Sequence, residues 1–336
     1  KTRIVLRKMI YIHKDVIYET VGGSWYYNIA HYLRKKRVSY KIVNGHNVDE
    51  VTSLNPTKDD IFIGRFAHDE LDKKLSKQTL PIIWDKFDKV FPSKKSYYFY
   101  DNKKRQYKFM LENNIPCLKT YSVKNKKDLS NLKIKYPIVL KKSWGAGSEQ
   151  VNYFDRFEDV IDNKKNRGWT LKSIYPTLVQ EYEDVEYDYK ILLFDSKFVI
   201  YKRLMNWKNG NKDNFPYGTE PNTREDILKL RKPPFKGAKM YDAFDDVDKD
   251  LMKLIKKLLK IQKKKLDTYF MGWDLLKTKD GYKVLEFSVV NEITIPNLKL
   301  FDLSKKEIIK YPSKKYFGDR EKKIVGIKNL INEYIN

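Results

Sequence analysis

The sequence has a single cysteine, Cys117, among its 336 residues. An internal disulfide therefore lacks its second thiol, and a cysteine-rich zinc site lacks its ligands. No stretch reaches the ~18 consecutive apolar residues that a transmembrane helix requires. These absences predict a protein without a membrane span, in a reducing, cytoplasmic setting.

Histidine is also scarce, and the chain has only His13, His31, His46 and His68. All four precede the region after about residue 95 in which the other candidate motifs lie. A Ser-His-Asp arrangement for nucleophilic catalysis is therefore not predicted for that region.

Acidic residues are outnumbered by basic ones, 44 to 69, which gives a net charge of +25. A charge of this size suits a polyanionic partner such as nucleic acid, an acidic polymer or a nucleotide. The lysines are spread along the whole chain, however, so a general lysine bias is the simpler explanation. Both explanations stay open on the sequence alone.

The first part of the chain, to about residue 95, alternates strand-like and helical segments. RIVLRKMIYI predicts a strand and GGSWYYNIAHYLRKKR a helix, and VSYKIVN, DDIFIGR and LPIIWDKFD continue the pattern. Strands separated by helices are typical of a parallel α/β layer. Since 41% of the chain is hydrophobic, a sizeable core is expected.

The pattern changes from about Ser96. DNKKRQYKFMLENNIP predicts a helix with Asp101 or Asn102 as N-cap and Pro116 just beyond its end. YPIVLKKSWGAGSEQVNYF predicts two strands joined by a glycine-containing loop. VDKDLMKLIKKLLKIQKKKLD has apolar residues at helical spacing, so we expect an amphipathic helix that packs over a sheet.

Lys141 ends the first of those two strands, where burying an ammonium group is costly unless it meets a negative charge. The loop GAGS, Gly145 to Ser148, follows within a few residues. Glycines let backbone N–H groups approach phosphate oxygens, and Ser148 adds a hydroxyl. Taken alone, Lys141 also fits an exposed edge strand, and GAGS also fits a plain hairpin turn.

Acidic side chains end several of the later apolar strands. In LVQEYE, Glu181 and its neighbour Tyr182 could meet an adenine edge, and Asp188 follows as a carboxylate for ribose hydroxyls. Asp274 and Glu286 lie on two strand-like runs joined by the turn KTKDGY, which predicts an antiparallel hairpin. Hard oxygen ligands of this kind suit Mg²⁺ that bridges nucleotide phosphates. A solvated acidic turn and ion-paired surface carboxylates are the simpler alternatives.

The order of these segments resembles the ATP-grasp superfamily, and most closely its RimK-like and glutathione-synthetase-like carboxylate–amine ligases. The resemblance covers roughly residues 97–294. It implies an α/β chain, α+β in the grasp region, with an ATP-grasp fold preceded by a Rossmann-like parallel α/β domain. The implied domains are an N-terminal domain at 1–95, a lid or small subdomain at 96–180, and a large subdomain with C-terminal helices at 181–336.

The resemblance also implies binding of ATP and Mg²⁺ and assigns roles to residues of this sequence. The nucleotide-binding residues that it implies are Lys103, Lys141, Gly145, Gly147, Ser148, Gln180, Glu181, Tyr182 and Asp188. The residues implied to hold the transferring phosphoryl group and the substrate carboxylate are Arg203, Lys190, Lys212 and Asn214. The metal ligands implied are Asp274 and Glu286.

The sequence departs from the family pattern around the metal site. Ser288 stands where the family usually has asparagine, two residues after the second acid. Asn291 is the alternative third ligand if the strand bends, because its odd spacing from Glu286 places it on the opposite face of a regular strand. We favour Asn291, since a carboxamide oxygen is the better ligand. Lysine also replaces arginine at Lys190 and Lys212, which keeps the charge but loses the two-point grip of arginine.

The activity that the resemblance implies is amide formation between a carboxylate, activated as an acylphosphate, and an amine. One alternative is an ATP-grasp kinase that phosphorylates a small molecule. Another is a basic nucleic-acid-binding protein that keeps a nucleotide site. A ligase acting on a polyanionic acceptor, such as a modified nucleic acid or an acidic peptide tail, would combine these features. Neither the substrates nor the oligomeric state is predicted.

Overall fold

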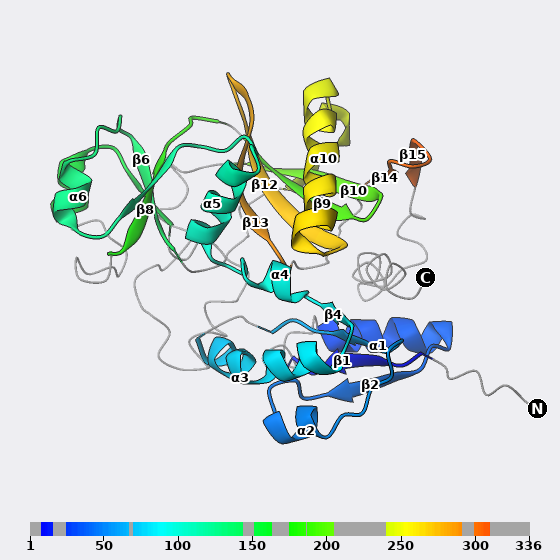
Figure 1. The fold of residues 1–336 in the computed structure, drawn as a ribbon. Helices are drawn as coiled ribbons and strands as arrows, with labels where there is room; N and C mark the ends of the chain where they lie inside the picture. The colour runs from blue at the N-terminus through cyan, green and yellow to red at the C-terminus, as the bar shows by residue number, and fades with distance from the viewer. Residues whose placement is uncertain are drawn as a thin grey trace, which may run out of the picture.

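In the computed structural model of the protein, three β-sheets form the framework of the part of the chain that is described (Figure 1). The structure describes residues 8–15, 25–66, 70–143, 151–162, 175–185, 187–204, 240–290 and 299–309. Within these ranges no helix is long and apolar enough to cross a membrane.

The N-terminal sheet is parallel, with strand order β2-β1-β3-β4. Its elements are β1 (Ile10–His13), α1 (Trp25–Lys36), β2 (Tyr40–Val43), α2 (Val48–Thr52), β3 (Ile61–Ile63), α3 (Glu70–Lys86) and β4 (Lys89–Phe91). Ile10 and Ile12 share a core with residues of α1, whereas Tyr11 shares another with residues of α2 and α3. Helices therefore cover both faces of the sheet, as the strand–helix alternation predicts.

The segment LPIIWDKFD differs from that prediction, because residues 80–86 belong to α3 and not to a further strand. Leu80, Ile83 and Phe87 are buried at spacings of three and four residues, which is the helical period. Pro81 lies inside this helix. A short apolar run does not separate strand from helix by periodicity alone, which explains the misassignment.

The small sheet is antiparallel, with strand order β5-β8-β6-β7. Its elements are β5 (Thr120–Val123), α6 (Lys126–Ser130), β6 (Ile138–Lys142), β7 (Val151–Phe154), α7 (Phe157–Asp162) and β8 (Thr177–Glu181). It has a core of its own, to which Val123, Leu129, Leu140 and Phe154 contribute. The expected pairing of the two strands on either side of GAGS is confirmed by the β6–β7 ladder.

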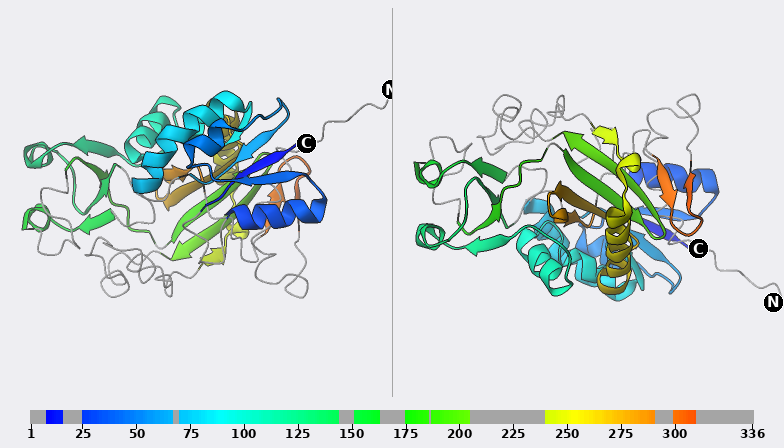
Figure 2. Two further views of the ribbon diagram at one scale, coloured as in Figure 1. Left: turned by 90° about the horizontal axis from the view of Figure 1, so that it is seen from below. Right: turned by 90° about the horizontal axis from the view of Figure 1, so that it is seen from above.

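The large sheet has strand order β13-β12-β9-β10-β14-β15, and β11 pairs with β10. Its elements are β9 (Tyr187–Phe194), β10 (Lys197–Leu204), β11 (Met240–Asp242), α10 (Lys249–Ile261), β12 (Phe270–Thr278), β13 (Gly281–Ser288), β14 (Leu300–Asp302) and β15 (Glu307–Ile309). The right panel of Figure 2 shows α10 lying over this sheet. Leu251, Leu254, Ile255 and Leu258 are buried, which confirms the predicted amphipathic helix.

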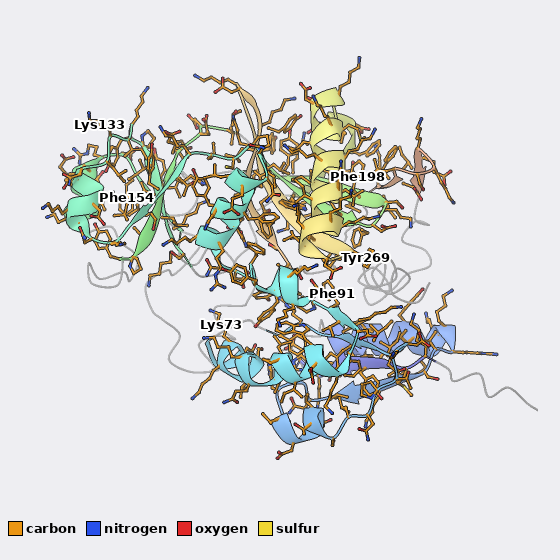
Figure 3. All side chains as sticks on the ribbon, in the orientation of Figure 1. Lys73, Phe91, Lys133, Phe154, Phe198 and Tyr269 are labelled. Carbon is orange, nitrogen blue, oxygen red and sulfur yellow. The ribbon has the colours of Figure 1, made fainter. Side chains whose placement is uncertain are left out.

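The N-terminal sheet and the large sheet share one continuous core. The Phe91 ring of β4 lies 6.1 Å from the Phe270 ring of β12, measured between centroids. Ser93 Oγ donates to the Leu266 carbonyl oxygen at 2.8 Å, which joins the same two parts of the chain. Figure 3 labels Phe91 and Tyr269 on the two sides of this contact. The small sheet, with its separate core, is the more independent unit.

Helix α5 (Lys103–Glu112) connects the small sheet with the large one and follows the short helix α4 (Lys94–Tyr97). Its N-cap is Asn102, whose side chain accepts a hydrogen bond from the Arg105 N–H at 3.0 Å. Asp101, the other expected cap, precedes it with a left-handed φ of 46°. The Lys103 N–H donates to the Ser143 carbonyl oxygen at 2.8 Å, so the first turn of α5 touches the end of β6.

Asp248 caps the N-terminus of α10 and joins it to the β12–β13 hairpin. Its carboxylate accepts from the Leu251 N–H at 2.8 Å, from Tyr282 OH at 2.9 Å and from Lys277 Nζ at 3.1 Å. We expect Asp248→Ala to lower the free energy of unfolding by about 1 kcal/mol at pH 7, the usual effect of losing an N-cap. Chemical denaturation measures this difference, and Asp250→Ala in the first turn is the matched control.

The contribution of Asp248 should depend on pH in a defined direction. Hydrogen bonding to the Leu251 N–H lowers the pKa of Asp248 below its ordinary value. A lowered carboxyl pKa stabilises the fold above the pKa of the unfolded chain, and this stabilisation disappears as the pH falls through the folded value. The difference between the wild type and Asp248→Ala should therefore shrink on going from pH 7 to pH 3. A difference that stays constant over this range would contradict the assignment.

Candidate active site

A row of three charged side chains crosses the large sheet at one level. Lys190 on β9 pairs with Asp274 on β12, and Asp274 pairs with Glu286 on β13. Opposed residues of an antiparallel pair project from the same face of the sheet. The hairpin predicted from KTKDGY is confirmed, since β12 and β13 pair from Thr278 and Gly281 onward. A two-residue turn thus brings both carboxylates side by side.

A β-bulge decides on which face Glu286 lies. The register of the hairpin shifts after Asp274, so that Leu285 is an additional residue on β13. Before the bulge Tyr282 and Val284 are buried in the core, and regular alternation would place Glu286 on that same buried face. The additional residue moves Glu286 to the other face, where 34% of its side chain is exposed. Bulges commonly re-aim side chains in this way.

Two ammonium groups already neutralise the carboxylates of this row. Lys190 Nζ lies 3.0 Å from Asp274 Oδ2 and donates also to Ser288 Oγ at 3.4 Å. Lys103 Nζ, from the first turn of α5, lies 3.5 Å from Glu286 Oε2. The Lys190 and Asp274 side chains are almost buried, and ions in such a setting require a partner because they have lost their hydration.

Lys141 reaches the same group of charges from the small sheet. It lies on β6, is 8% exposed, and pairs in register with Leu178 of β8. Burial lowers the pKa of Lys141, and the carboxylates of Glu286, Asp274 and Asp188 act in the opposite direction. The sequence interpretation of Lys141 as an exposed edge lysine does not hold, since the side chain is buried and interacts with carboxylates of the large sheet. An incoming anion would offset the cost of burying this ammonium.

Asp188 and Arg203 occupy the neighbouring position in the large sheet. Asp188 precedes Lys190 by two residues on β9 and therefore shares its face. It is buried, and the sheet register pairs it with Arg203 on β10 and with Leu276 on β12. Asp188, a predicted nucleotide-binding residue, and Arg203, which is predicted to hold the phosphoryl group, are thus paired across neighbouring strands.

The segment expected to contact adenine lies between the small and large sheets. Gln180 and Glu181 end β8 and Tyr182 follows, whereas β9 of the large sheet begins at Tyr187. The Gln180 side chain is buried and donates to Thr120 Oγ1 at 2.9 Å, so its described contacts hold the small sheet together. Tyr182 OH instead donates to Asp184 Oδ1 at 3.2 Å, beyond the end of the strand. The adenine contact itself stays a prediction.

Several predicted site residues lie outside the residues that the structure describes. These are Gly145, Gly147 and Ser148 of the glycine loop, Lys212 and Asn214, and Asn291. The Arg203 backbone belongs to β10, but its side chain is likewise outside the description. The predicted roles of these residues stay predictions.

The architecture is shared with solved structures. Carboxyaminoimidazole ribonucleotide synthase from Aspergillus clavatus, complexed with ATP, matches with a TM-score of 0.55 at 10% identity, over 84% of this chain and 70% of that chain. D-cycloserine synthetase DcsG matches with a TM-score of 0.54 at 12% identity, over 96% of this chain and 99% of that chain. The ATP-grasp ligase PsnB, complexed with a minimal precursor, matches with a TM-score of 0.54 at 10% identity, over 84% of this chain and 90% of that chain.

The chain has the ATP-grasp fold. No protein-family model and no curated protein matches the sequence. Because the identities to these structures are low, the likeness concerns the fold and leaves the chemistry to be argued from the residues. The expected fold class, an ATP-grasp fold preceded by a parallel α/β layer, is confirmed. The domain limits at residues 95 and 180 stay a prediction.

The donor set of the candidate site fits magnesium. Within the described ranges no three His, Cys, Asp or Glu side chains gather to hold a metal. Magnesium, however, usually takes only one or two protein carboxylates when substrate phosphates and water supply its other ligands. Asp274 and Glu286, opposed across the hairpin, match that requirement. Lys190 Nζ donates both to Asp274 Oδ2 and to Ser288 Oγ. Ser288, which stands where the resemblance predicts asparagine, therefore lies within the site.

Two residues near Asp274 and Glu286 were not identified from the sequence as site residues. Gln106 on α5 donates from Nε2 to the Phe287 carbonyl oxygen at 2.7 Å and accepts from the Phe287 N–H at 3.2 Å. It therefore fixes the backbone between Glu286 and Ser288. Asp101, before the N-cap of α5, is electrostatically coupled to Glu286, and burial raises its pKa to about 6.

Gln106 should act as a positioning residue, and its replacement should destabilise β13. We expect Gln106→Leu to lower the free energy of unfolding by about 1–3 kcal/mol, since two backbone groups of Phe287 lose a buried partner. Thermal or chemical unfolding measures the change, and Gln78→Leu on the exposed side of α3 is the matched control. Equal stabilities of the two variants would show that Gln106 does not hold the strand.

Proposed function

We propose that the protein is an ATP- and magnesium-dependent ligase that joins a carboxylate to an amine. The observation that carries this proposal is the opposed carboxylate pair Asp274 and Glu286 on the large sheet, with Lys103 Nζ 3.5 Å from Glu286 Oε2. The buried Lys141 of the small sheet interacts electrostatically with the same carboxylates. A nucleoside triphosphate with its metal requires both kinds of group. Lysines pair with the negative phosphates, and carboxylates bind the positive metal ion. The ATP-grasp fold of the chain supports the same interpretation.

The roles of the residues follow from their charges. Magnesium, held by Asp274 and Glu286, would supply positive charge that offsets the charge of the phosphates. Lys141 would bind phosphate oxygens, and it stays protonated there because an anion opposes the effect of burial on its pKa. Lys103 exchanges its contact with Glu286 for the nucleotide. Lys190 donates to Asp274 and so orients its carboxylate. We therefore assign Lys190 a positioning role and not direct binding of the phosphoryl group.

The reaction has two steps that need little covalent chemistry from the protein. The substrate carboxylate takes the γ-phosphoryl group of ATP, with ADP as leaving group, and gives an acylphosphate. An amine then attacks the acyl carbon and releases phosphate, which leaves an amide. Positioning and charge stabilisation accelerate both steps, as in other phosphoryl transfers. Arg203, Lys212 and Asn214 stay the candidates for holding the carboxylate.

The solved structures do not select the acceptor. One of them holds ADP with 5-aminoimidazole ribonucleotide, and PsnB holds a precursor together with magnesium and ADP in another structure. Those ligands belong to those proteins, and their diversity shows that one fold accepts very different substrates. An ATP-grasp kinase is the second candidate here, since it uses the same ATP and metal residues and stops after the first step.

Product analysis separates the ligase from the kinase. Incubation with ATP, magnesium and sets of carboxylates and amines, followed by mass spectrometry, should give an amide whose formation requires both partners. A phosphorylated product formed without any amine would favour the kinase. Binding of nucleic acid without ATP turnover under all conditions would favour the third possibility, a basic binding protein.

The carboxylate pair should be required for magnesium-dependent use of ATP. We expect Asp274→Asn and Glu286→Gln each to lower ADP release by about 100-fold or more, because each removes charge at the point where the phosphate charge is balanced. Isothermal titration calorimetry should also show that magnesium no longer strengthens ATP binding. Asp280→Asn, in the exposed turn of the same hairpin, is the matched control. Unchanged ADP release by both variants would sink the metal assignment.

Lys141 should contribute to nucleotide affinity directly. We expect Lys141→Met to weaken ATP binding about 10- to 100-fold, which corresponds to the loss of one charged hydrogen bond of about 1.5–3 kcal/mol. Methionine fills a similar volume, so the small sheet should keep its stability. Lys133→Met, at an exposed position of the same part of the chain, is the matched control. If Lys141→Met binds ATP as tightly as the control, Lys141 does not contact phosphate.

A further inference from the structure

A second cavity lies where the N-terminal layer meets the small sheet, and we name it the junction cavity. It has a volume of about 990 Å³ and lies between α3, α4, the first turn of α5 and the ends of β6 and β8. Residues from both layers line it, among them Ser76 of α3 and Ser143 after β6. This volume is at the upper end of the range for small-molecule pockets.

The charge of the junction cavity has one sign. Five cationic side chains line it, namely Lys73, Lys77, Lys94, Arg105 and Lys142. Among the described residues that line it there is no carboxylate. A hollow lined by side chains of one charge attracts anions, and a bound polyanion fits it.

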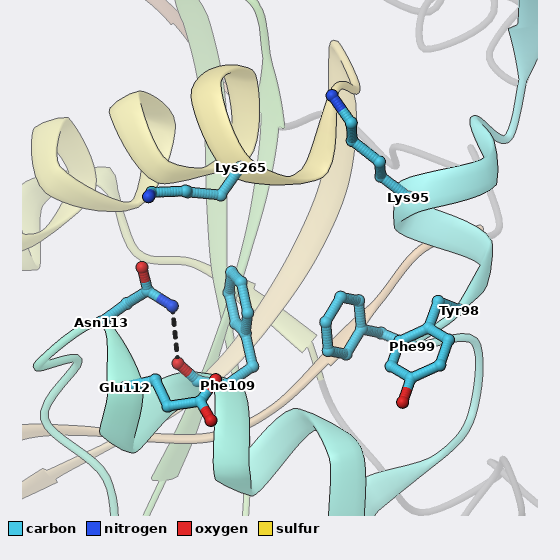
Figure 4. A pocket seen from close by; sticks show the side chains of 7 residues that line it. All are labelled: Lys95, Tyr98, Phe99, Phe109, Glu112, Asn113 and Lys265. Atoms are coloured by element: carbon cyan, nitrogen blue, oxygen red, sulfur yellow. Dashed lines mark hydrogen bonds between the residues drawn. The ribbon is translucent and has the colours of Figure 1, made fainter.

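A smaller neighbouring pocket shows that this charge is not general to the surface. That pocket has a volume of about 500 Å³ and is shown in Figure 4. Its two lysines, Lys95 and Lys265, are accompanied by the Glu112 carboxylate and the Asn113 amide. The Asn113 amide donates to the Phe109 carbonyl oxygen at 2.9 Å. Lysine bias alone therefore yields a mixed lining there, in contrast to the junction cavity.

Aromatic rings form a second feature of the junction cavity. Trp84, Tyr97 and Tyr98 line it, and Tyr98 is 55% exposed. The Arg105 guanidinium lies 4.0 Å from the centroid of the Tyr98 ring and donates to the Tyr98 carbonyl oxygen at 2.9 Å. The guanidinium is thus held over one face of the exposed Tyr98 ring. Rings combined with cations are the usual means of binding a nucleobase with its phosphate.

The junction cavity adjoins the candidate active site along the chain. Lys142 and Ser143 directly follow Lys141, and Asn102 directly precedes Lys103. The Lys103 N–H bond to the Ser143 carbonyl oxygen joins the two segments at this border. The cavity and the candidate active site therefore share these backbone segments, while Lys141 and Lys142 project to opposite faces of β6.

We propose that the junction cavity binds a second ligand of nucleotide chemistry, an aromatic base that carries phosphate, in addition to the ATP between the sheets. The ring would lie on Tyr98 and the phosphate would meet Lys77 and Lys94. That this ligand is a substrate rests on the proposed ligase function, whereas its binding does not. A free nucleotide and the terminal nucleotide of a strand offer the same chemistry to this cavity.

The test is a binding experiment on the full chain with the ATP site filled. The protein is saturated with the non-hydrolysable β,γ-imido analogue of ATP and magnesium, and uridine 5′-monophosphate or a uridine tetranucleotide is then titrated by calorimetry. We expect a second binding event. Comparable affinities for both probes would identify a free nucleotide as the source. Tighter binding of the tetranucleotide, with a steep salt dependence, would identify a strand terminus.

Matched charge reversals locate the binding event. Lys77→Glu combined with Lys94→Glu should weaken it by about 10-fold or more, since two charged contacts are lost. Lys74→Glu combined with Lys104→Glu changes the net charge equally at exposed positions that do not line the cavity, and it should have a much smaller effect. Tyr98→Ala should weaken binding about fivefold or more through lost stacking, compared with Tyr27→Ala at another exposed ring.

Two results would overturn the proposal. One is the lack of any second binding event with either probe at millimolar concentration. The other is equal weakening by the two charge-reversal pairs, which would make the binding a property of net charge. Neither result bears on the ligase proposal, because the ATP analogue titration and the ADP release of Asp274→Asn are measured separately. Retained binding of the ATP analogue by all four cavity and control variants shows that they are folded.

Discussion

The Lys190–Asp274 ion pair is the contact on which the arrangement of the candidate site depends. It joins two neighbouring strands of the large sheet at a buried position, and a buried carboxylate without a cation would be strongly destabilising. With Asp274 held, the hairpin places Glu286 beside it, and the bulge at Leu285 turns Glu286 away from the core. Lysines from α5 and from the small sheet then complete a group in which cations surround the two carboxylates.

The surrounding structure is organised to keep this group of charges in one geometry. The core shared by the N-terminal sheet and the large sheet makes a firm base, and α10 covers one face of that base. Helix α5 supports the strand of Glu286 through Gln106. A site that is built on strands and supported from behind by a helix meets the general requirement for preorganised charges.

Much of this arrangement is accessible from the sequence, because it depends on local patterns. The hairpin follows from the KTKDGY turn, and the amphipathic period predicts α10. Three features are not accessible in this way. The short apolar run LPIIWDKFD does not show whether its period is helical. Gln106 contacts the backbone of Phe287, which lies 181 residues further along the chain. The bulge at Leu285 has no signal in the amino-acid composition. Long-range contacts and register shifts are properties of the packed sheets and not of any one segment.

The bond from the Lys103 N–H to the Ser143 carbonyl oxygen has a mechanical consequence. The small sheet is joined to the remainder at this bond, at the link after Glu181, and where the Val284 N–H donates to the Pro116 carbonyl oxygen at 2.7 Å. The two hydrogen bonds tie the end of β6, which carries Lys141, to the first turn of α5, and the segment before β5 to β13, which carries Glu286. The cation of one sheet and the carboxylate of the other therefore lie on strands that are joined by backbone bonds.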